Sequence, residues 1–197
     1  MVYRRTPRIQ ARMDSQRGQI LDAALELLAE RGYAGCSMAA VAAQAGIATG
    51  SVYRHFPGKA ELIVELFRLV VTHEVAAVER AAEQPAEIPA RIVAVVETFA
   101  GRALKAPRLA YALLAEPVDA PVEAERLVFR HAFRDVIARW VREGVRAGVL
   151  PAQDAEITAA AIVGATAEVL IGPLTTDNTD AVPELCTFTL RALGVPG

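Results

Sequence analysis

The sequence predicts an all-α protein, on three observations. Apolar residues recur with the helical period of about 3.6 in nearly every segment between glycines and prolines. No segment alternates convincingly with a period of two, as a half-buried strand would. Hydrophobic residues make up 53% of the 197 residues and charged residues 22%, enough apolar material for a folded core. We expect about nine helices, with a three-helix helix-turn-helix domain in residues 1–58 and a helical bundle in residues 59–197.

The first three helices have clear start and stop signals. Each begins at a short side chain with an oxygen atom, the type that caps helix N-termini, and each ends at glycine or proline. Gly32 suits the position after the first helix, and Gly46 suits the turn between the second and third, because glycine tolerates positive φ. The predicted ranges and caps are about 15–31 (Asp14 or Ser15), 37–45 (Ser37) and 49–55 (Thr49).

The remaining helices are separated by prolines and glycines. Pro121 suits the first turn of the seventh helix, because proline is well placed where no backbone N–H is needed. The predicted ranges are about 59–84, 90–105, a short helix after Pro107 that ends before Pro117, 121–147, 154–171 and 183–193.

Charge is unevenly distributed along the chain. Residues 1–59 carry eight basic and four acidic residues, whereas the remainder carries 13 basic and 19 acidic residues. Five arginines precede residue 18, and only Asp14 opposes them. A basic arm on an otherwise acidic protein indicates either a polyanionic partner or an ordinary solvated terminus.

Cysteine usage and hydropathy favour a soluble cytoplasmic protein. Cys36 and Cys186 are far apart and form no disulfide framework, so we expect reduced thiols. The basic N-terminus lacks the apolar segment of a secretory signal. The longest charge-free apolar stretch in a predicted helix, residues 157–167, is too short to span a membrane. We therefore expect no membrane association.

Residues 37–62 form the most informative segment. Ala42 and Ala45 let two short helices approach closely around Gly46, and Ile47 and Val52 can fill the space between them. The third helix then offers hydrogen-bond donors, and no acidic residue follows until Glu61. A surface that faces phosphates needs donors and no carboxylates. The donors are Thr49, Ser51, Tyr53, Arg54 and His55.

The joint spacing of several residues in this segment resembles the TetR family of bacterial transcriptional regulators. The resemblance covers about residues 15–62 and departs mildly at Val41 and Cys36. It rests on Gly32-Tyr33, Val41-Ala42, Ala45-Gly46-Ile47, Tyr53, His55-Phe56, Lys59 and Leu62.

The resemblance implies roles for individual residues. Ser37 would bind a phosphate through its hydroxyl and the helix N-terminus. Thr49, Gly50 and Ser51 would lie nearest the base edges in the major groove. Further phosphate contacts would come from Tyr53, His55 and Lys59. Arg54 could read guanine or grip a phosphate, and the arginine arm could enter a minor groove or add counterion release.

The resemblance further implies a homodimer that binds a palindromic operator in double-stranded DNA and responds to a small-molecule effector of unknown identity. We expect a repressor, with no catalytic residue, metal or cofactor. The eighth helix is rich in small residues and could be a dimer face or an ordinary buried helix. A largely apolar effector pocket should lie among the fourth to eighth helices. Size and placement select as its candidate residues Phe67, Val71, Phe99, Tyr111, Phe133 and Thr166.

The alternative function is a small all-α enzyme or carrier that uses this pocket. Ser51 and His55 lie four residues apart, as a nucleophile and its base could, but no orienting carboxylate lies nearby. Phe56 is expected in the core, and Tyr53 could lie there too. Two further pairs could ligate a metal, although a surface or pocket-lining role is expected for both. These pairs are His73 with Glu74 and His131 with Asp135.

Overall fold

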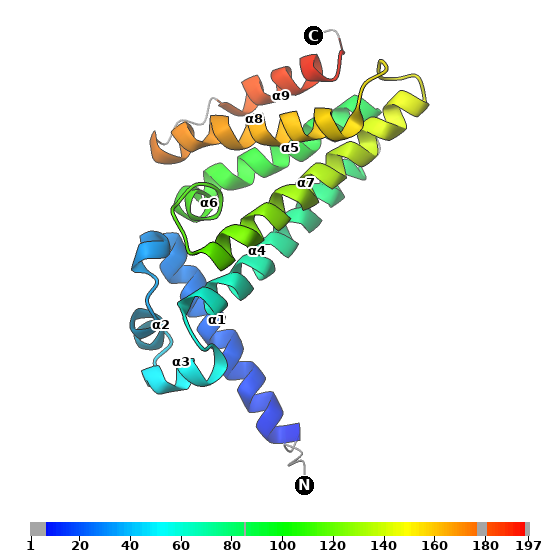
Figure 1. Ribbon diagram of the computed structural model, residues 1–197. Coiled ribbons are helices and arrows are strands. Elements are labelled where there is room, and N and C mark those ends of the chain that lie inside the picture. The colour runs from blue at the N-terminus through cyan, green and yellow to red at the C-terminus, as the bar shows by residue number, and fades with distance from the viewer. Residues whose placement is uncertain (1–6, 85, 177–180, 196–197) are drawn as a thin grey trace.

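A computed structural model describes residues 7–84, 86–176 and 181–195, and all the regular structure in these ranges is α-helical (Figure 1). The all-α prediction is confirmed. The described helices are α1 (Pro7–Gly35), α2 (Met38–Gln44), α3 (Thr49–His55), α4 (Lys59–Ala82), α5 (Ile88–Lys105), α6 (Pro107–Leu114), α7 (Ala120–Arg146), α8 (Ala155–Thr176) and α9 (Ala181–Ala192).

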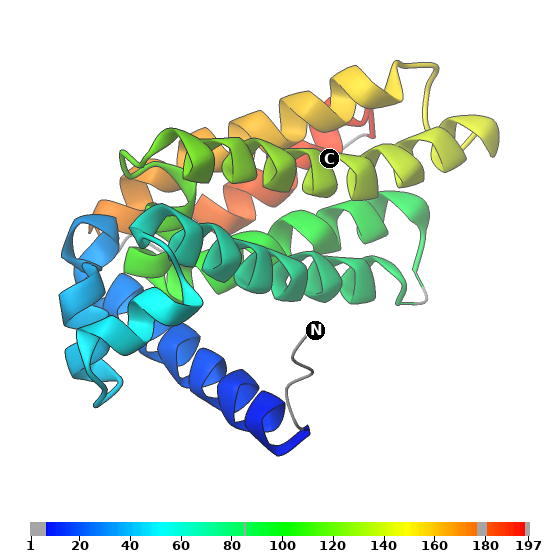
Figure 2. The ribbon, with the colours of Figure 1, turned by 60° about the horizontal axis from the view of Figure 1, so that its bottom comes forward.

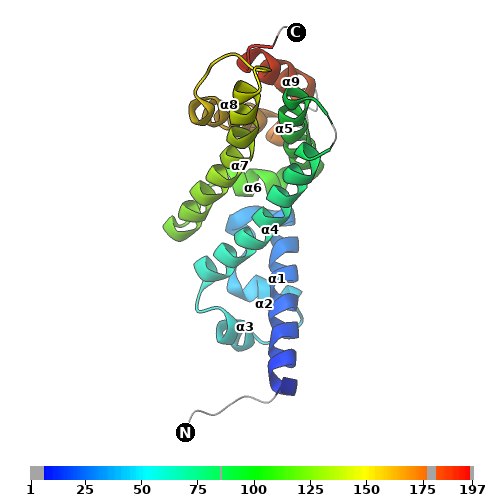
Figure 3. The ribbon, with the colours of Figure 1, turned by 90° about the vertical axis from the view of Figure 1, so that its right-hand side faces the viewer.

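The helices form two hydrophobic cores, and α4 contributes to both. Helices α1–α3 lie at one end of the molecule, α8 and α9 lie at the other, and α4 runs from the first part into the second (Figures 1 and 3). Leu66 and Phe67 of α4 pack in the first core, which also takes Leu113 from α6. Val78 and Ala82 of α4 pack in the second core. The two parts are therefore joined by shared packing as well as by the chain.

Helix α1 begins earlier than predicted. It starts at Pro7 rather than near Ser15, so part of the arginine arm is helical. Its N-terminal half stands away from the bundle (Figure 2). At the other end Gly32 adopts a φ of 68°, as expected for a helix-terminating glycine, and one further helical turn follows.

The helix-turn-helix forms largely as predicted. The Oγ of Ser37 accepts a hydrogen bond of 3.1 Å from the backbone N–H of Ala40, so Ser37 caps α2. Gly46 makes the turn with a φ of 66°, and Val52, on the inner face of α3, is completely buried. The cap assigned to Thr49 was wrong, because the N-cap of α3 is Ala48 and Thr49 is the first helical residue.

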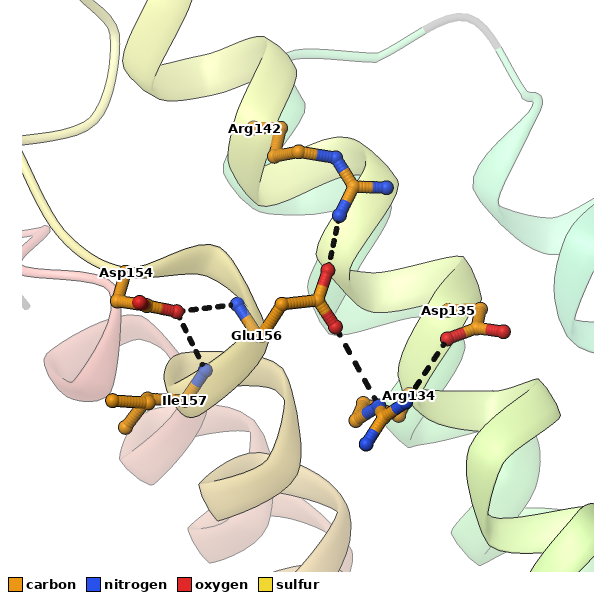
Figure 4. Close-up of polar contacts among 6 residues, drawn as sticks. All are labelled: Arg134, Asp135, Arg142, Asp154, Glu156 and Ile157. Carbon is orange, nitrogen blue, oxygen red and sulfur yellow. Dashed lines mark hydrogen bonds and ion pairs between the residues drawn. The ribbon is translucent and has the colours of Figure 1, made fainter.

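Polar contacts hold the N-terminal end of α8 against α7 (Figure 4). The carboxylate of Asp154 accepts hydrogen bonds of 2.9 and 3.0 Å from the backbone N–H groups of Glu156 and Ile157, so Asp154 caps the helix as its predicted start implied. The Glu156 carboxylate pairs with Arg142 and Arg134 of α7. These contacts fix which face of α8 points outward.

Helix α8 continues five residues beyond its predicted end. It extends past Glu168 to Thr176, and Pro173 lies inside its last turn. By length and composition its segment Ala155–Leu174 is apolar enough to cross a membrane, contrary to the expectation from residues 157–167. Only 28% of that segment is buried within the chain. Helix α8 thus leaves much of its apolar surface exposed in the isolated chain.

The loop between α6 and α7 binds the end of α1. The Glu116 carboxylate accepts a hydrogen bond of 2.7 Å from the backbone N–H of Tyr33, and the Tyr33 hydroxyl donates to Asp119. The buried Arg126 of α7 secures this loop by donating to the carbonyl oxygens of Leu113 and Glu116, each at 2.8 Å. A movement of α6 would therefore displace the loop residues that contact the end of α1.

Candidate DNA-binding surface and effector cavity

Helix α3 presents an exposed surface without carboxylates. Thr49, Gly50 and Arg54 are exposed, and 52% of Tyr53 is accessible, which excludes a core position for that tyrosine. Phe56, by contrast, is 1% exposed and confirms the expected core position. A Cβ built on Gly50 would meet no heavy atom within 4 Å. The outer face of α3 is thus sterically open.

Arg17 of α1 fixes the end of α3. Its Nη1 donates to the carbonyl oxygen of His55 at 3.0 Å, and its Nε donates to Oε1 of Glu65 in α4 at 2.9 Å. The guanidinium also lies 4.3 Å from the centre of the Phe56 ring. One arginine therefore joins α1, α3 and α4. Sequence reasoning counted Arg17 only as part of the basic arm. Because Arg17 and Glu65 are 48 residues apart, no local pattern indicated that Arg17 joins these helices.

His55 is tied to α1 and has a lowered pKa. Its Nε2 lies 3.0 Å from Oε1 of Gln16, and because an amide oxygen only accepts, Nε2 carries the proton. Partial burial lowers the pKa of His55, and the positive charges of Arg17 and Arg54 lower it further. The neutral imidazole is therefore the favoured form at neutral pH.

Four other predicted DNA contacts make internal hydrogen bonds. The Ser37 hydroxyl caps α2, as described above. Nη2 of Arg54 donates to Oγ of Ser51 at 2.7 Å. Nζ of Lys59 donates to the carbonyl oxygen of Tyr33 at 2.6 Å. Their contacts with DNA remain predictions, and for Lys59 the structure adds a second role at the end of α1.

A cavity of about 290 Å³ opens among helices α4 to α7. Its wall is mainly apolar, and its charged residues are Glu74, Arg102 and Lys105. A second hollow of about 30 Å³ lies among α5 to α8. The two share Phe99, Leu114 and Phe129 as wall residues. Together they give the bundle an apolar interior space with charge at one side.

The predicted pocket residues fall in different places. Phe99, Phe133 and Thr166 lie together around the smaller hollow, and Phe99 also lines the larger cavity. Phe67 and Val71 line a separate depression between α4 and α7. Tyr111 is half-buried against the second core and lines none of the described cavities. Sequence reasoning expected a surface or pocket-lining role for Glu74, but it missed Arg102, because charges on amphipathic helices read as solvated surface.

The two cysteines and the candidate metal ligands suggest no other site. Burial raises the pKa of the Cys36 thiol to about 11, which makes it a poor nucleophile. Burial also raises the pKa of Cys186. Within the described ranges no three His, Cys, Asp or Glu side chains are grouped to hold a metal ion.

Comparison with known proteins finds a family similarity in the N-terminal part of the chain. Residues 20–66 match the family model of bacterial regulatory proteins of the tetR family, which confirms the resemblance for this segment. The chain is 42% identical over 50 residues to the fatty acid metabolism regulator protein of Bacillus subtilis. It is 39% identical over 61 residues to the transcriptional repressor KstR2 of Mycobacterium tuberculosis.

These matched segments cover 25% and 31% of this chain, and 26% and 30% of the respective relatives. The sequence likeness to these two relatives therefore covers less than a third of either chain.

Solved structures extend the likeness of fold to most of the chain. The structure of the regulator FadR from Bacillus subtilis in complex with stearoyl-CoA covers 91% of this chain and 98% of its own, with a TM-score of 0.77 and 20% identity. A TetR transcription regulator from Haloarcula marismortui covers 92% and 97%, with a TM-score of 0.80 and 17% identity. At such low identity the likeness concerns the fold alone.

Proposed function

We propose that this protein is a cytoplasmic, homodimeric transcriptional repressor released from its operator by a small molecule, because residues 20–66 match the model of tetR-family regulatory proteins and the chain shares the fold of solved regulators. The observation that carries the proposal is the exposed face of α3, which offers donors and no carboxylate on a helix-turn-helix frame. Residues 1–58 would bind DNA, and residues 59–197 would bind the effector and form the dimer.

The proposed DNA contacts divide into base-reading and phosphate-binding residues. Thr49, Gly50 and Ser51 form the first turn of α3, whose N-terminus would point into the major groove. The phosphate contacts would come from Ser37, Tyr53, His55 and Lys59, and the basic arm would add counterion release. Arg54 could serve in either set.

The proposed dimer interface is the outward face of α8 together with α9. Ile157 and Val169 of α8 are 69% and 46% exposed, and Phe188 of α9 is 41% exposed. Ala161 and Gly164 also lie on the exposed side of α8. Small residues allow close approach of two helices, and the apolar ones would be buried against the second copy. A palindromic operator follows from the two-fold symmetry.

The proposed effector site is the cavity among α4 to α7. Val70 and Leu113 line this cavity and also belong to the first core, which holds α1 to α3. A ligand that displaces either residue would change how α4 and α6 support the helix-turn-helix. The expected mechanism is a population shift, in which the ligand favours a conformer whose two recognition helices no longer match the half-site spacing.

Selection of bound fragments from the source genome tests the proposal. The full-length protein should enrich fragments with a common inverted repeat, and its affinity for that repeat should fall steeply with salt. A small enzyme or carrier would enrich no sequence and would show no such salt dependence on duplex DNA. That outcome would sink the proposal.

A further inference from the structure

The charged side of the cavity contains one ion pair that joins two helices. Glu74 of α4 accepts two hydrogen bonds from Arg102 of α5, Nε to Oε2 and Nη2 to Oε1, each of 2.6 Å. The Glu74 carboxylate raises the pKa of Arg102. The side chain of Arg102 is 47% exposed and that of Glu74 is 19% exposed. The pair is therefore accessible to a ligand and to water.

A second cation lies at the same side of the cavity. Lys105 of α5 lines the cavity and is exposed. Within the described part of the chain it makes no hydrogen bond or ion pair. Among the described residues that line the cavity, Glu74 is the only acidic one, whereas Arg102 and Lys105 are basic. This side of the cavity thus has a surplus of positive charge that an anion would complement.

The rest of the wall favours a hydrocarbon chain. The remaining lining residues are aliphatic or aromatic, including Val70, Leu109 and Leu113. The cavity meets the smaller hollow at Phe99 and Phe129, whose ring centres are 6.4 Å apart. Rotation of these rings would join the two spaces into one apolar passage. Such a passage fits an extended chain better than a compact polar molecule.

We infer that the cavity binds a ligand with an extended apolar chain and an anionic end group, and that this end group takes the place of Glu74 on Arg102. The inference rests on the proposed function, since it names the chemical class of the effector. Replacement is feasible because an exposed ion pair in water is weakly held. Lys105 would supply the second charge for the incoming anion.

The exchange would remove a polar contact between α4 and α5, which would then be held together by apolar packing. Glu74 lies on α4 between Val70, which packs in the first core, and Val78, which packs in the second. The pair with Arg102 therefore holds α4 near the point where its two halves meet. Once the ligand occupies Arg102, this tie is lost and α4 can change its tilt. The anionic end group of the ligand would thus trigger the change in α4, and the apolar chain of the ligand would provide most of the affinity.

Direct binding measured without DNA tests the ligand class. The probes are dodecanoate, its methyl ester and dodecanoyl-CoA, applied to the full-length protein below their micelle concentrations. We expect dodecanoate or dodecanoyl-CoA to bind about tenfold more tightly than the uncharged ester. The tighter of the two anions identifies the end group as a carboxylate or as the phosphates of coenzyme A. Failure of all three to bind, or equal binding of the ester and both anions, would overturn the inference.

Three variants test the role of the ion pair. Arg102→Gln should abolish the preference for the anion, whereas Arg139→Gln, at an exposed arginine of α7, should retain it. Glu74→Gln should bind the anion more tightly, because its competitor is gone, but the ligand should then no longer change operator affinity. Circular dichroism verifies that each variant is folded. An anion preference that survives Arg102→Gln would overturn the inference, whereas loss of sequence-specific DNA binding would refute only the proposed function.

Discussion

The ammonium group of Lys59 caps the end of α1 through Tyr33. Nζ of Lys59 lies 2.6 Å from the Tyr33 carbonyl oxygen and 3.7 Å from the centre of the Tyr33 ring. The same tyrosine donates its hydroxyl hydrogen to Asp119, and burial together with this bond raises its pKa to about 12. Lys59 is therefore linked through Tyr33 to the loop that precedes α7. A residue proposed to bind phosphate is also part of the contact between the two parts of the molecule.

Lys59→Ala should affect both stability and DNA binding. Loss of the cap and of the cation–π contact should lower the free energy of unfolding by about 1 to 2 kcal/mol. If Lys59 also binds a phosphate, the slope of log K against log salt should fall by about one unit. Chemical denaturation and a salt series of operator binding measure the two effects. Lys105→Ala, far from α3, should leave the slope unchanged, and an unchanged slope in Lys59→Ala would leave that residue a structural role only.

Gly50→Ala should separate DNA binding from folding. The added Cβ meets no atom of the free protein, and alanine is the better helix former, so the free energy of unfolding should rise by up to about 1 kcal/mol. Operator binding should weaken by about tenfold if backbone at this position approaches a base edge. Gly101→Ala is the matched control, because its Cβ is equally unobstructed and lies in α5. If Gly50→Ala and Gly101→Ala bind the operator with equal affinity, Gly50 does not lie at the DNA interface.

Thr49 and His55 should differ in how they affect sequence preference. Thr49→Ala should change the preferred base at one operator position per half-site, at a cost of about 1–3 kcal/mol. His55→Ala should weaken binding to all sequences alike, as loss of a phosphate contact would. Binding of each variant to a panel of single-base operator changes measures this difference. If Thr49→Ala instead weakens binding equally across the panel, base reading must come from Arg54 or the N-terminal arm.

The lowered pKa of His55 predicts a pH-dependent stability. The pKa is below its unfolded value of 6.5, so the unfolded chain binds the proton more readily than the folded one. The free energy of unfolding should therefore decrease as the pH falls from about 6.5 to the pKa of His55 in the folded protein. His55→Gln should lessen this decrease, which denaturation at neutral and mildly acidic pH would measure. If the free energy of unfolding decreases equally in the unmodified protein and in His55→Gln, the lowered pKa of His55 is contradicted.

Ala161→Arg should split the proposed dimer. Ala161 is exposed on α8, so the arginine leaves the isolated chain folded but places an unpaired charge in the interface. Light scattering should then report a monomer, and operator affinity should fall with it. Ala124→Arg, at an exposed alanine of α7, serves as the control and should remain dimeric. A dimeric Ala161→Arg that still binds DNA would place the interface elsewhere.

Local signals were sufficient for most of the fold. Ser37, Gly32 and Gly46 each marked a helix end, because capping and positive φ depend on one residue and its neighbours. The start of α1 was missed, although Pro7 carried a valid signal for a first helical turn. The end of α8 was also missed, since the helix continues through Pro173 to Thr176. Helix ends without a specific residue type remain hard to place.

The contacts that join distant segments could not be predicted in the same way. Arg17 and Glu65 are 48 residues apart, and Tyr33 and Asp119 are 86 apart. Arg126 looks like a surface charge in the sequence, yet it is 5% exposed and donates to carbonyl oxygens. Such pairs depend on how helices pack, and one sequence contains no record of that packing. A cavity was expected among the fourth to eighth helices, but Arg102 and Lys105 at its charged side were not expected.

The division of α4 between two cores has a consequence for protein engineering. A chain cut at residue 58 would lose Leu62, Ile63 and Leu66, all fully buried in the first core. The isolated fragment would expose its apolar interior and should aggregate rather than fold. A chimaera that joins this DNA-reading part to another sensor should instead keep α4 at least through Val70, together with a substitute for Leu113. Interchangeable modules in this architecture therefore meet within a helix and not at a linker.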